Sequence, residues 1–273
     1  MNIENIKFVK EFVKVSTDCF KKGWNERNGG NLTYRLSEED VKDIQPWIKD
    51  SEKRTYPLGV TLKDLANEYF FVSGSGKFFR NVCLDLQGNC GLIQLDNQGE
   101  NYTILWGLVD DGKPTSELPS HLMCHSVKKR TTNNKNRVIL HSHTTNTVAL
   151  TFVLPLTSEA FTKEIWEMIT ECPMIFPTGI GVVEWMVPGS VAIGERTRDM
   201  MEKHDVVVWA HHGMFVCGDT LDLAFGLMDT VEKAAEILVK VRSMGGKKQT
   251  ITREHFEAIG NEFDIDIDLS LLK

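Results

Sequence analysis

Several features are missing from this 273-residue sequence, and each absence argues against a class of protein. The six cysteines form no CxxC pair and are too sparse for a small disulfide-rich secreted scaffold. No stretch approaches the roughly 20 apolar residues of a membrane span, and the N-terminus carries charges where a signal peptide needs an apolar run. We therefore expect reduced, mostly buried thiols in a cytoplasmic protein that does not bind membranes.

An excess of basic residues is missing too. The sequence has 31 Lys and Arg against 38 Asp and Glu, a net charge of −7, and no clustered basic run that would neutralise phosphates, so we expect no nucleic-acid partner. No GxGxxG follows a predicted strand, which argues against a dinucleotide-binding oxidoreductase. A Walker A loop is excluded because Phe71 stands where its first glycine would be and Phe78 follows Lys77.

Alternating helix and strand patterns indicate an α/β or α+β protein, and no repeat or composition break marks a linker, so residues 1–273 are expected to form a single domain. Residues 37–66 are charged and irregular, with a short helix predicted from Leu62. The other predicted helices cover residues 6–24, 114–127, 146–154, 159–169, 190–203 and a long segment from Leu221 to Gly245-Gly246. The helix predicted at 114–127 is expected to have a hydroxyl residue as its N-cap. Strands are predicted at 32–36, 69–72, 91–95, 102–106, 138–143, 175–176, 182–183 and 206–209.

Histidines at two predicted strand ends form the sharpest chemical pattern. His141 and His143 are one residue apart, so on a strand both side chains point to the same face and can hold one ion. This pair alone is weak evidence, because one histidine can be packed in the core and the other exposed. The second strand end, His211-His212-Gly213, offers a third imidazole and a glycine that lets the backbone turn sharply. Three imidazoles without cysteine favour an open, catalytic zinc site.

Glu117 is the natural companion of these histidines. It lies in the first turn of a predicted helix, where free N–H groups and the helix dipole favour a carboxylate. Simple helix capping is the more common role of such a glutamate, and the residue alone leaves both roles open. His121 and His125 have the spacing of a ligand pair, but their run ends in Lys128-Lys129-Arg130 and predicts a solvated face.

Two glycine-rich turns offer donors to an anion. Residues 28–31 (NGGN) and 73–77 (SGSGK) present backbone N–H groups, amides and hydroxyls, although each turn alone is a weak signal. Together with the hydroxyl pair Thr115-Ser116 and the histidine cluster, they suggest a phosphorylated small molecule held beside a Lewis acid.

At these residues the chain resembles the class II aldolase family, which contains fuculose-phosphate aldolase and ribulose-phosphate 4-epimerase. The HxH motif, the later HHG and the upstream SELP are shared across that family. NERNGGN, GSGKFFRN and SMGGKKQTI are similar to its rhamnulose branch in particular. The stretches that carry the resemblance are spread over residues 21–255: KGWNERNGGNLTYRL, VSGSGKFFRN, ILWGL, PTSELPSHL, RVILHSHTTNTVALTFVL, WMVPGS, HHGMFVCGDTLDLAFGLMDTVEKAAEILVK and SMGGKKQTITREH.

The resemblance implies a fold and a set of ligands. The fold would be α/β, in α/β/α layers, with a central mostly antiparallel sheet flanked by helices, assembled as a C4 homotetramer with sites at subunit interfaces. One Zn²⁺ per subunit would be held by His141, His143 and His212, while His211 stays outside the coordination shell. The positions that match the family's phosphate-binding loops are Asn28, Gly29, Asn31, Ser75, Gly76, Thr115 and Ser116.

The resemblance also implies an activity, the reversible cleavage of the phosphorylated ketose L-rhamnulose 1-phosphate to dihydroxyacetone phosphate and L-lactaldehyde. Glu117 would move protons at the enediolate carbon. Glu171, supplied by a neighbouring subunit, would help with the proton on the aldehyde-side hydroxyl. The alternatives are a sister activity, on fuculose 1-phosphate or as a pentulose-5-phosphate epimerase, and a non-catalytic protein like the adducin head domain, which should have lost the ligands present here.

Overall fold

The central feature of the fold is a mixed nine-stranded sheet, in a computed structural model that describes residues 3–48 and 53–272. Across the sheet the strands run in the order β2-β5-β4-β3-β1-β6-β9-β8-β7, and each neighbouring pair is antiparallel except the parallel pair β7 and β8. The predicted, mostly antiparallel central sheet is therefore confirmed. The strands are β1 (Asn31–Arg35), β2 (Arg54–Pro57), β3 (Tyr69–Ser73), β4 (Cys90–Leu95), β5 (Asn101–Gly107), β6 (Val138–Ser142), β7 (Ile180–Val183), β8 (Val206–Trp209) and β9 (Gly213–Gly218).

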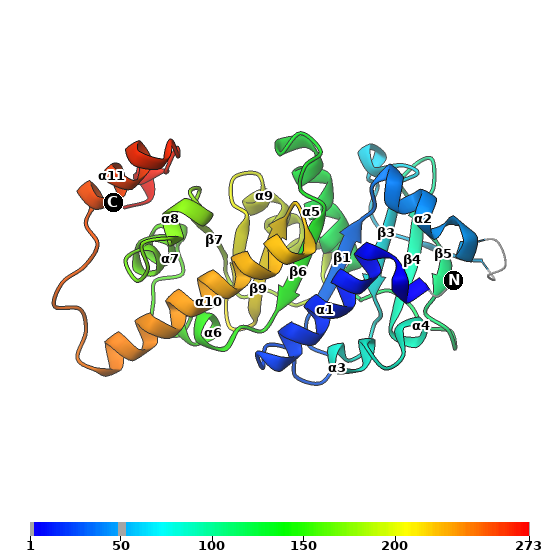
Figure 1. Ribbon diagram of the computed structural model, residues 1–273, viewed down its shortest axis with the longest axis horizontal. Coiled ribbons are helices and arrows are strands. Elements are labelled where there is room, and N and C mark those ends of the chain that lie inside the picture. Colours follow the sequence, from blue (N-terminus) through cyan, green and yellow to red (C-terminus); the bar gives the residue numbers. More distant parts are fainter. Residues whose placement is uncertain (1–2, 49–52, 273) are drawn as a thin grey trace.

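One face of the sheet carries the largest apolar core. The helices α1 (Lys7–Lys21) and α10 (Leu221–Ser243) cross this face side by side, in front of the sheet in Figure 1. In α1, Phe8, Phe12 and Val15 recur at helical spacing and are buried, and the ring of Phe12 packs edge-on against Phe71 of β3. The other helices that contribute to this core are α2 (Glu38–Ile48), α3 (Phe79–Val82), α4 (Leu86–Asn89), α6 (Thr145–Leu150), α7 (Ser158–Trp166), α8 (Cys172–Ile175) and α11 (Arg253–Phe263), with the 3₁₀ turns η1 (Ile3–Asn5) and η3 (Leu269–Leu272).

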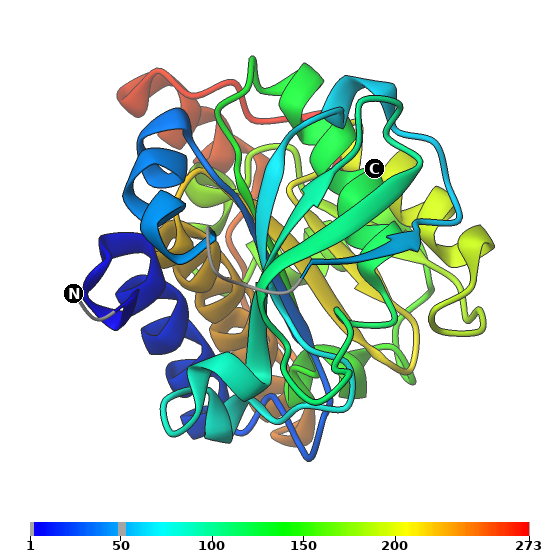
Figure 2. The ribbon, with the colours of Figure 1, turned by 90° about the vertical axis from the view of Figure 1, so that its right-hand side faces the viewer.

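The opposite face is covered by α5 (Leu118–Thr131) and α9 (Val191–Met201), which pack against each other. Cys124 of α5 and Ile193 of α9 belong to one buried cluster with Phe215 of β9. Figure 2 shows the twisted sheet with helices on both of its faces. The expected α/β/α layering is thus present, and it leaves the ends of β1, β6 and β9 to carry the side chains of the site.

The charged segment 37–66 contains structure that its pattern did not predict. Helix α2 forms because three acidic residues occupy its first turn, where the helix dipole favours negative charge, and Ile44 and Ile48 bury one face. Strand β2 pairs with β5 at the edge of the sheet. The helix predicted from Leu62 is a single 3₁₀ turn, η2 (Lys63–Leu65).

Three other predictions differ from the structure. The strand predicted at residues 175–176 is wrong, because Ile175 ends α8, whose Pro173 is tolerated in the first turn. Strand β9 and the helices α3, α4 and α11 were not predicted at all. The N-cap of α5 is Glu117 rather than a hydroxyl residue.

The thiols behave as expected from the sequence. All six cysteines are free, five are buried and Cys83 alone is exposed. Within the described residues, no helix combines the length and apolar character needed to cross a membrane.

Candidate active site

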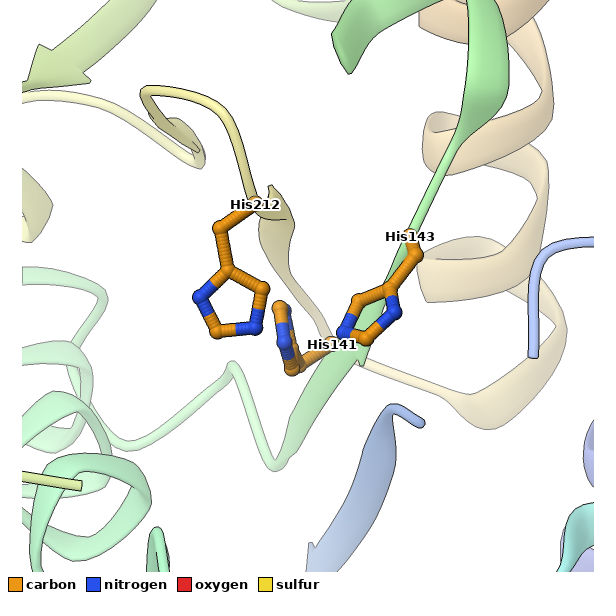
Figure 3. Close-up of side chains that lie close together, drawn as sticks. All are labelled: His141, His143 and His212. Atoms are coloured by element: carbon orange, nitrogen blue, oxygen red, sulfur yellow. The ribbon is translucent and has the colours of Figure 1, made fainter. Parts of the chain in front are cut away.

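Three of the predicted site residues converge at the ends of two neighbouring strands. His141 lies in β6 and His143 just after it, whereas His212 lies in the turn that enters β9 (Figure 3). A nitrogen of each ring lies within 4.8 Å of a nitrogen of the other two. The spacing of two residues in β6 brings its two imidazoles together as predicted, and the antiparallel pairing of β6 with β9 supplies the third.

The hydrogen bonds around the cluster leave ring nitrogens without a partner. Nδ1 of His141 donates to the carbonyl oxygen of Met214 at 3.1 Å, so its buried Nε2 carries a lone pair and has no hydrogen-bond partner among the described residues. Nδ1 of His143 lies 2.7 Å from Oε1 of Glu26. A backbone carbonyl or carboxylate on the far side of the ring is the usual support of a metal-binding histidine. The donor set and the orphaned nitrogen therefore fit a bound metal ion.

Burial keeps the imidazoles of His141 and His212 neutral. Burial, and secondarily the proximity of His212 and His143, holds the pKa of His141 well below its usual range. Burial also lowers the pKa of His212 to about 4, with a further contribution from His143. The neutral imidazole is the form that coordinates metals, so His141 and His212 present ring nitrogens at neutral pH without having to lose protons.

The turn between β8 and β9 brings His212 close to β6 by two separate means. His211 adopts the left-handed conformation, with φ of 61°, so the sharp turn expected of Gly213 is made by His211 instead. Gly213 is needed for space, because a Cβ there would lie 2.5 Å from the carbonyl oxygen of Ser142 and 2.9 Å from Cε1 of His141. His211 itself is turned away, with its Nδ1 3.1 Å from Oγ1 of Thr151.

Glu117 faces this cluster from the N-terminus of α5. Its Oε2 lies 3.8 Å from Nε2 of His141 and accepts a hydrogen bond of 2.8 Å from Nδ2 of Asn31. Although Glu117 is the N-cap residue, its side chain caps no backbone N–H group of α5, so the simple capping role does not apply. The residue is 7% exposed, and burial raises the pKa of its carboxyl group against the opposing effect of the Asn31 hydrogen bond.

The histidines and Glu117 lie at the base of a cleft of about 190 Å³. All seven residues predicted to bind phosphate line it, from the three loops that precede β1, follow β3 and precede α5. No Lys or Arg contributes to its described lining, so an anion here would meet neutral donors and the N-terminus of α5. The lining residues are Asn28, Gly29, Gly30, Asn31, Gly74, Ser75, Gly76, Thr115, Ser116, Glu117, His141, His143, Pro188 and His212.

Comparison with known proteins places this site in a family. Residues 10–239 match the family model described as Class II Aldolase and Adducin N-terminal domain. This chain belongs to the class II aldolase family. It is 51% identical to rhamnulose-1-phosphate aldolase from Klebsiella pneumoniae strain 342, over 94% of this chain and 93% of the relative. It is 50% identical to rhamnulose-1-phosphate aldolase from Escherichia fergusonii, over 97% of this chain and 96% of that relative.

A solved sugar-phosphate aldolase shares the architecture. The crystal structure of a sugar-phosphate aldolase from Thermotoga maritima has a TM-score of 0.75 and 32% sequence identity to this chain, covering 88% of this chain and 97% of that one. The match covers most of both chains, so the two proteins share one fold.

Glu171 is the predicted site residue that the structure does not bring to the cleft. It is exposed at the N-terminus of α8 and is absent from the residues that line the cleft. Glu171 therefore takes no part in the cleft of its own chain. Its role in the site of a neighbouring subunit stays a prediction.

The predicted solvated face of α5 is wrong. His121 and His125 are both fully buried and form hydrogen bonds to Thr33 of β1. The basic run misled the prediction because the amine of Lys128, itself buried, pairs with Asp205 at 2.7 Å rather than pointing into solvent. Sequence reasoning also missed Glu26 behind His143, since nothing in its local pattern distinguishes it from a surface acid.

Proposed function

We propose that this class II aldolase cleaves L-rhamnulose 1-phosphate reversibly to dihydroxyacetone phosphate and L-lactaldehyde. The observation that carries the proposal is about 50% identity, over nearly the full length of both chains, to enzymes named rhamnulose-1-phosphate aldolase. The cleft supports it with a metal-competent histidine cluster beside a buried carboxylate. This combination suits a reaction in which negative charge develops on a carbonyl oxygen and a proton is moved at the neighbouring carbon.

His141, His143 and His212 would hold one Zn²⁺ per subunit. Bound there, the ion would act as a Lewis acid that stabilises negative charge on the ketone and adjacent hydroxyl oxygens of the substrate. The three imidazoles, without cysteine, are the donor set of an open catalytic zinc site, which keeps a position for substrate. The bare Nε2 of His141 and the supported ring of His143 are the observations that favour these ligands.

Glu117 would move the proton at the reacting carbon. In the cleavage direction the C3–C4 bond breaks, its electron pair stays with C3, and C3 takes a proton to complete dihydroxyacetone phosphate. At the same time the C4 hydroxyl loses its proton as C4 becomes the aldehyde carbon. A buried carboxyl group with a raised pKa is suited to hold a proton and deliver it to C3, and to remove it again in the synthetic direction.

The phosphate group would be held by the three loops at the mouth of the cleft. Asn28, Gly29, Asn31, Ser75, Gly76, Thr115 and Ser116 would contribute backbone N–H groups, hydroxyls and amides. One N–H of the Asn31 amide is already donated to Glu117. Asn31 would therefore link the phosphate loops to the proton-transfer group.

We further propose that the single domain of this chain assembles as a homotetramer in which Glu171 enters the cleft of a neighbouring subunit and handles the C4 hydroxyl proton. Large apolar side chains stand exposed close to the cleft: Phe152 is 69% exposed beside His211, and Trp185 and Val187 are 63% and 61% exposed next to the cleft residue Pro188. Exposed apolar side chains near the cleft favour a subunit interface there. Six free thiols suit a reducing, cytoplasmic environment.

Subunit complementation tests the assembly. Glu117→Gln and Glu171→Ala variants, each nearly inactive alone, are co-expressed with separate tags, and mixed oligomers are purified. If Glu171 acts across an interface, random C4 assembly restores about a quarter of the wild-type sites. No recovery in mixed oligomers would show that both carboxylates must come from one chain.

Turnover tests the activity itself. Purified protein is assayed for release of dihydroxyacetone phosphate from L-rhamnulose 1-phosphate and from L-fuculose 1-phosphate, and for epimerisation of a pentulose 5-phosphate, before and after chelation and after addition of Zn²⁺. We expect preferential cleavage of rhamnulose 1-phosphate, lost on chelation and restored by zinc. A preference for either other substrate would assign the sister activity instead.

A further inference from the structure

A row of buried polar side chains runs along one face of β1, away from the cleft. Asn31, Thr33 and Arg35 alternate with residues that face α1, and on α5 the side chains of His121 and His125 meet them. Asn31 is 7% exposed and the other four are fully buried. We call these five residues the β1–α5 polar row. It leads from Glu117 at the cleft toward Arg35 at the far end of the strand.

The hydrogen bonds of the β1–α5 polar row have one consistent direction. Because the Glu117 carboxylate accepts from Nδ2 of Asn31, Oδ1 of that amide faces Nε2 of His121, which must carry the proton. Nδ1 of His121 then accepts from the hydroxyl of Thr33 at 2.9 Å. The same hydroxyl oxygen accepts from Nε2–H of His125 at 2.8 Å. Each group thereby fixes the orientation or tautomer of the next, and the series ends on Oε2 of Glu117.

The surroundings of the row are apolar. The ring of His125 lies 5.2 Å from that of Phe70, and the ring of His121 lies 5.2 Å from that of Phe215. Burial lowers the pKa of His121 to about 3 and, with the nearby charge of Arg35, holds the pKa of His125 well below its usual range, so both rings stay neutral. A buried polar network contributes little net stability compared with apolar side chains of the same shape. Stability alone therefore gives no reason for this row.

We propose that Thr33, His121 and His125 are positioning residues, which lock the Asn31 amide and through it hold the Glu117 carboxylate toward His141. The inference rests on the proposed role of Glu117 in proton transfer. Without the row, the Asn31 amide can rotate and present its oxygen to the carboxylate, which repels Glu117 from its present position. Proton transfer is sensitive to such displacements, whereas phosphate binding by the other loop residues is not.

The test compares two substitutions at one position. Thr33→Val replaces the hydroxyl with a methyl group of similar size and leaves both histidine nitrogens unpaired, whereas Thr33→Ser keeps the hydroxyl. For Thr33→Val we expect kcat to fall about tenfold, the equivalent of one hydrogen bond, with KM and bound metal unchanged. Thr33→Ser should restore kcat to near the wild-type value. Thr162→Val is the matched control, because Thr162 is equally buried. Its hydroxyl oxygen accepts a hydrogen bond from the backbone N–H of Ile180, in a different part of the fold.

Other results would overturn the proposal. If Thr33→Val is less stable but turns over at the wild-type rate per metal-loaded chain, the row is only structural. If Thr33→Ser loses as much kcat as Thr33→Val, the methyl group rather than the hydroxyl matters. A neutron crystal structure provides a readout independent of activity: it should show His121 protonated at Nε2, and protonation at Nδ1 alone would refute the hydrogen-bond direction. If the wild-type protein cleaves no sugar phosphate, the proposed function is wrong. The neutron structure would still test the hydrogen-bond direction of the β1–α5 polar row in that case.

Discussion

Replacing Gly213 with alanine should damage the histidine cluster, because the added Cβ has no room. It would lie 2.5 Å from the carbonyl oxygen of Ser142, 2.9 Å from Cε1 of His141 and 3.2 Å from Cδ2 of His143. Non-bonded atoms pack best at about 3.5–4.0 Å, and a backbone oxygen cannot rotate away, so β9 must move from β6 by roughly half an ångström or more. Metal–ligand distances tolerate only about 0.2 Å.

We therefore expect Gly213→Ala to bind its metal at least about tenfold more weakly and to lose about 1–3 kcal/mol of stability. The assay titrates each variant with a competing chelator, measures the metal retained by elemental analysis and follows thermal unfolding. Gly226→Ala is the control, since nothing lies within 4 Å of a Cβ at that position of α10, and alanine there should stabilise the helix by up to about 1 kcal/mol. Wild-type metal affinity and kcat in Gly213→Ala would refute the packing argument.

Three further predictions follow from the same geometry. Glu117→Gln should retain bound metal while kcat falls by about 10²–10⁴, and full activity with metal present would contradict the proposed role. Removal of the metal should abolish turnover and lower the unfolding temperature, because the ion binds only the folded chain; calorimetry with and without chelator measures this. His121, with a folded pKa of about 3, stays neutral while the unfolded side chain gains a proton below pH ~6.5. The contribution of His121 to the free energy of unfolding should therefore fall as pH falls, by roughly 1 kcal/mol per pH unit between pH 6 and pH 4. His121→Gln should reduce the pH slope of the free energy of unfolding in denaturant titrations by that amount, and an unchanged slope would show that His121 is not buried neutral.

The part of the site that could be predicted from sequence depends on local geometry. The spacing of His141 and His143 determines that both face the same side of β6, because side chains alternate along any strand. Glu117 was found because it precedes an apolar helical run with a proline in its first turn. Each of these two signals is contained in a few consecutive residues, so it does not depend on how the rest of the chain folds.

The part that could not be predicted depends on contacts between distant segments. The burial of His121 and His125 follows from the packing of α5 on β1, and their spacing alone is equally typical of an exposed face. The edge strand β2 is stabilised by pairing with β5, which its charged sequence does not reveal. Glu171 does not line the cleft of its own chain, so neither its sequence nor its place at the start of α8 defines its role.

The placement of His141, His143 and His212 at the ends of β6 and β9 has a consequence for how a metal site would form. These strands are neighbours in the sheet, yet α6, α7, α8, β7, α9 and β8 lie between them in the chain. A partly folded chain therefore has two histidines on β6 and no third, and two imidazoles form an incomplete and weaker site. A metal site of three histidines would therefore form only where β6 and β9 have paired. An ion bound there would cross-link segments that are remote in sequence, and its removal would loosen the sheet first at the site itself.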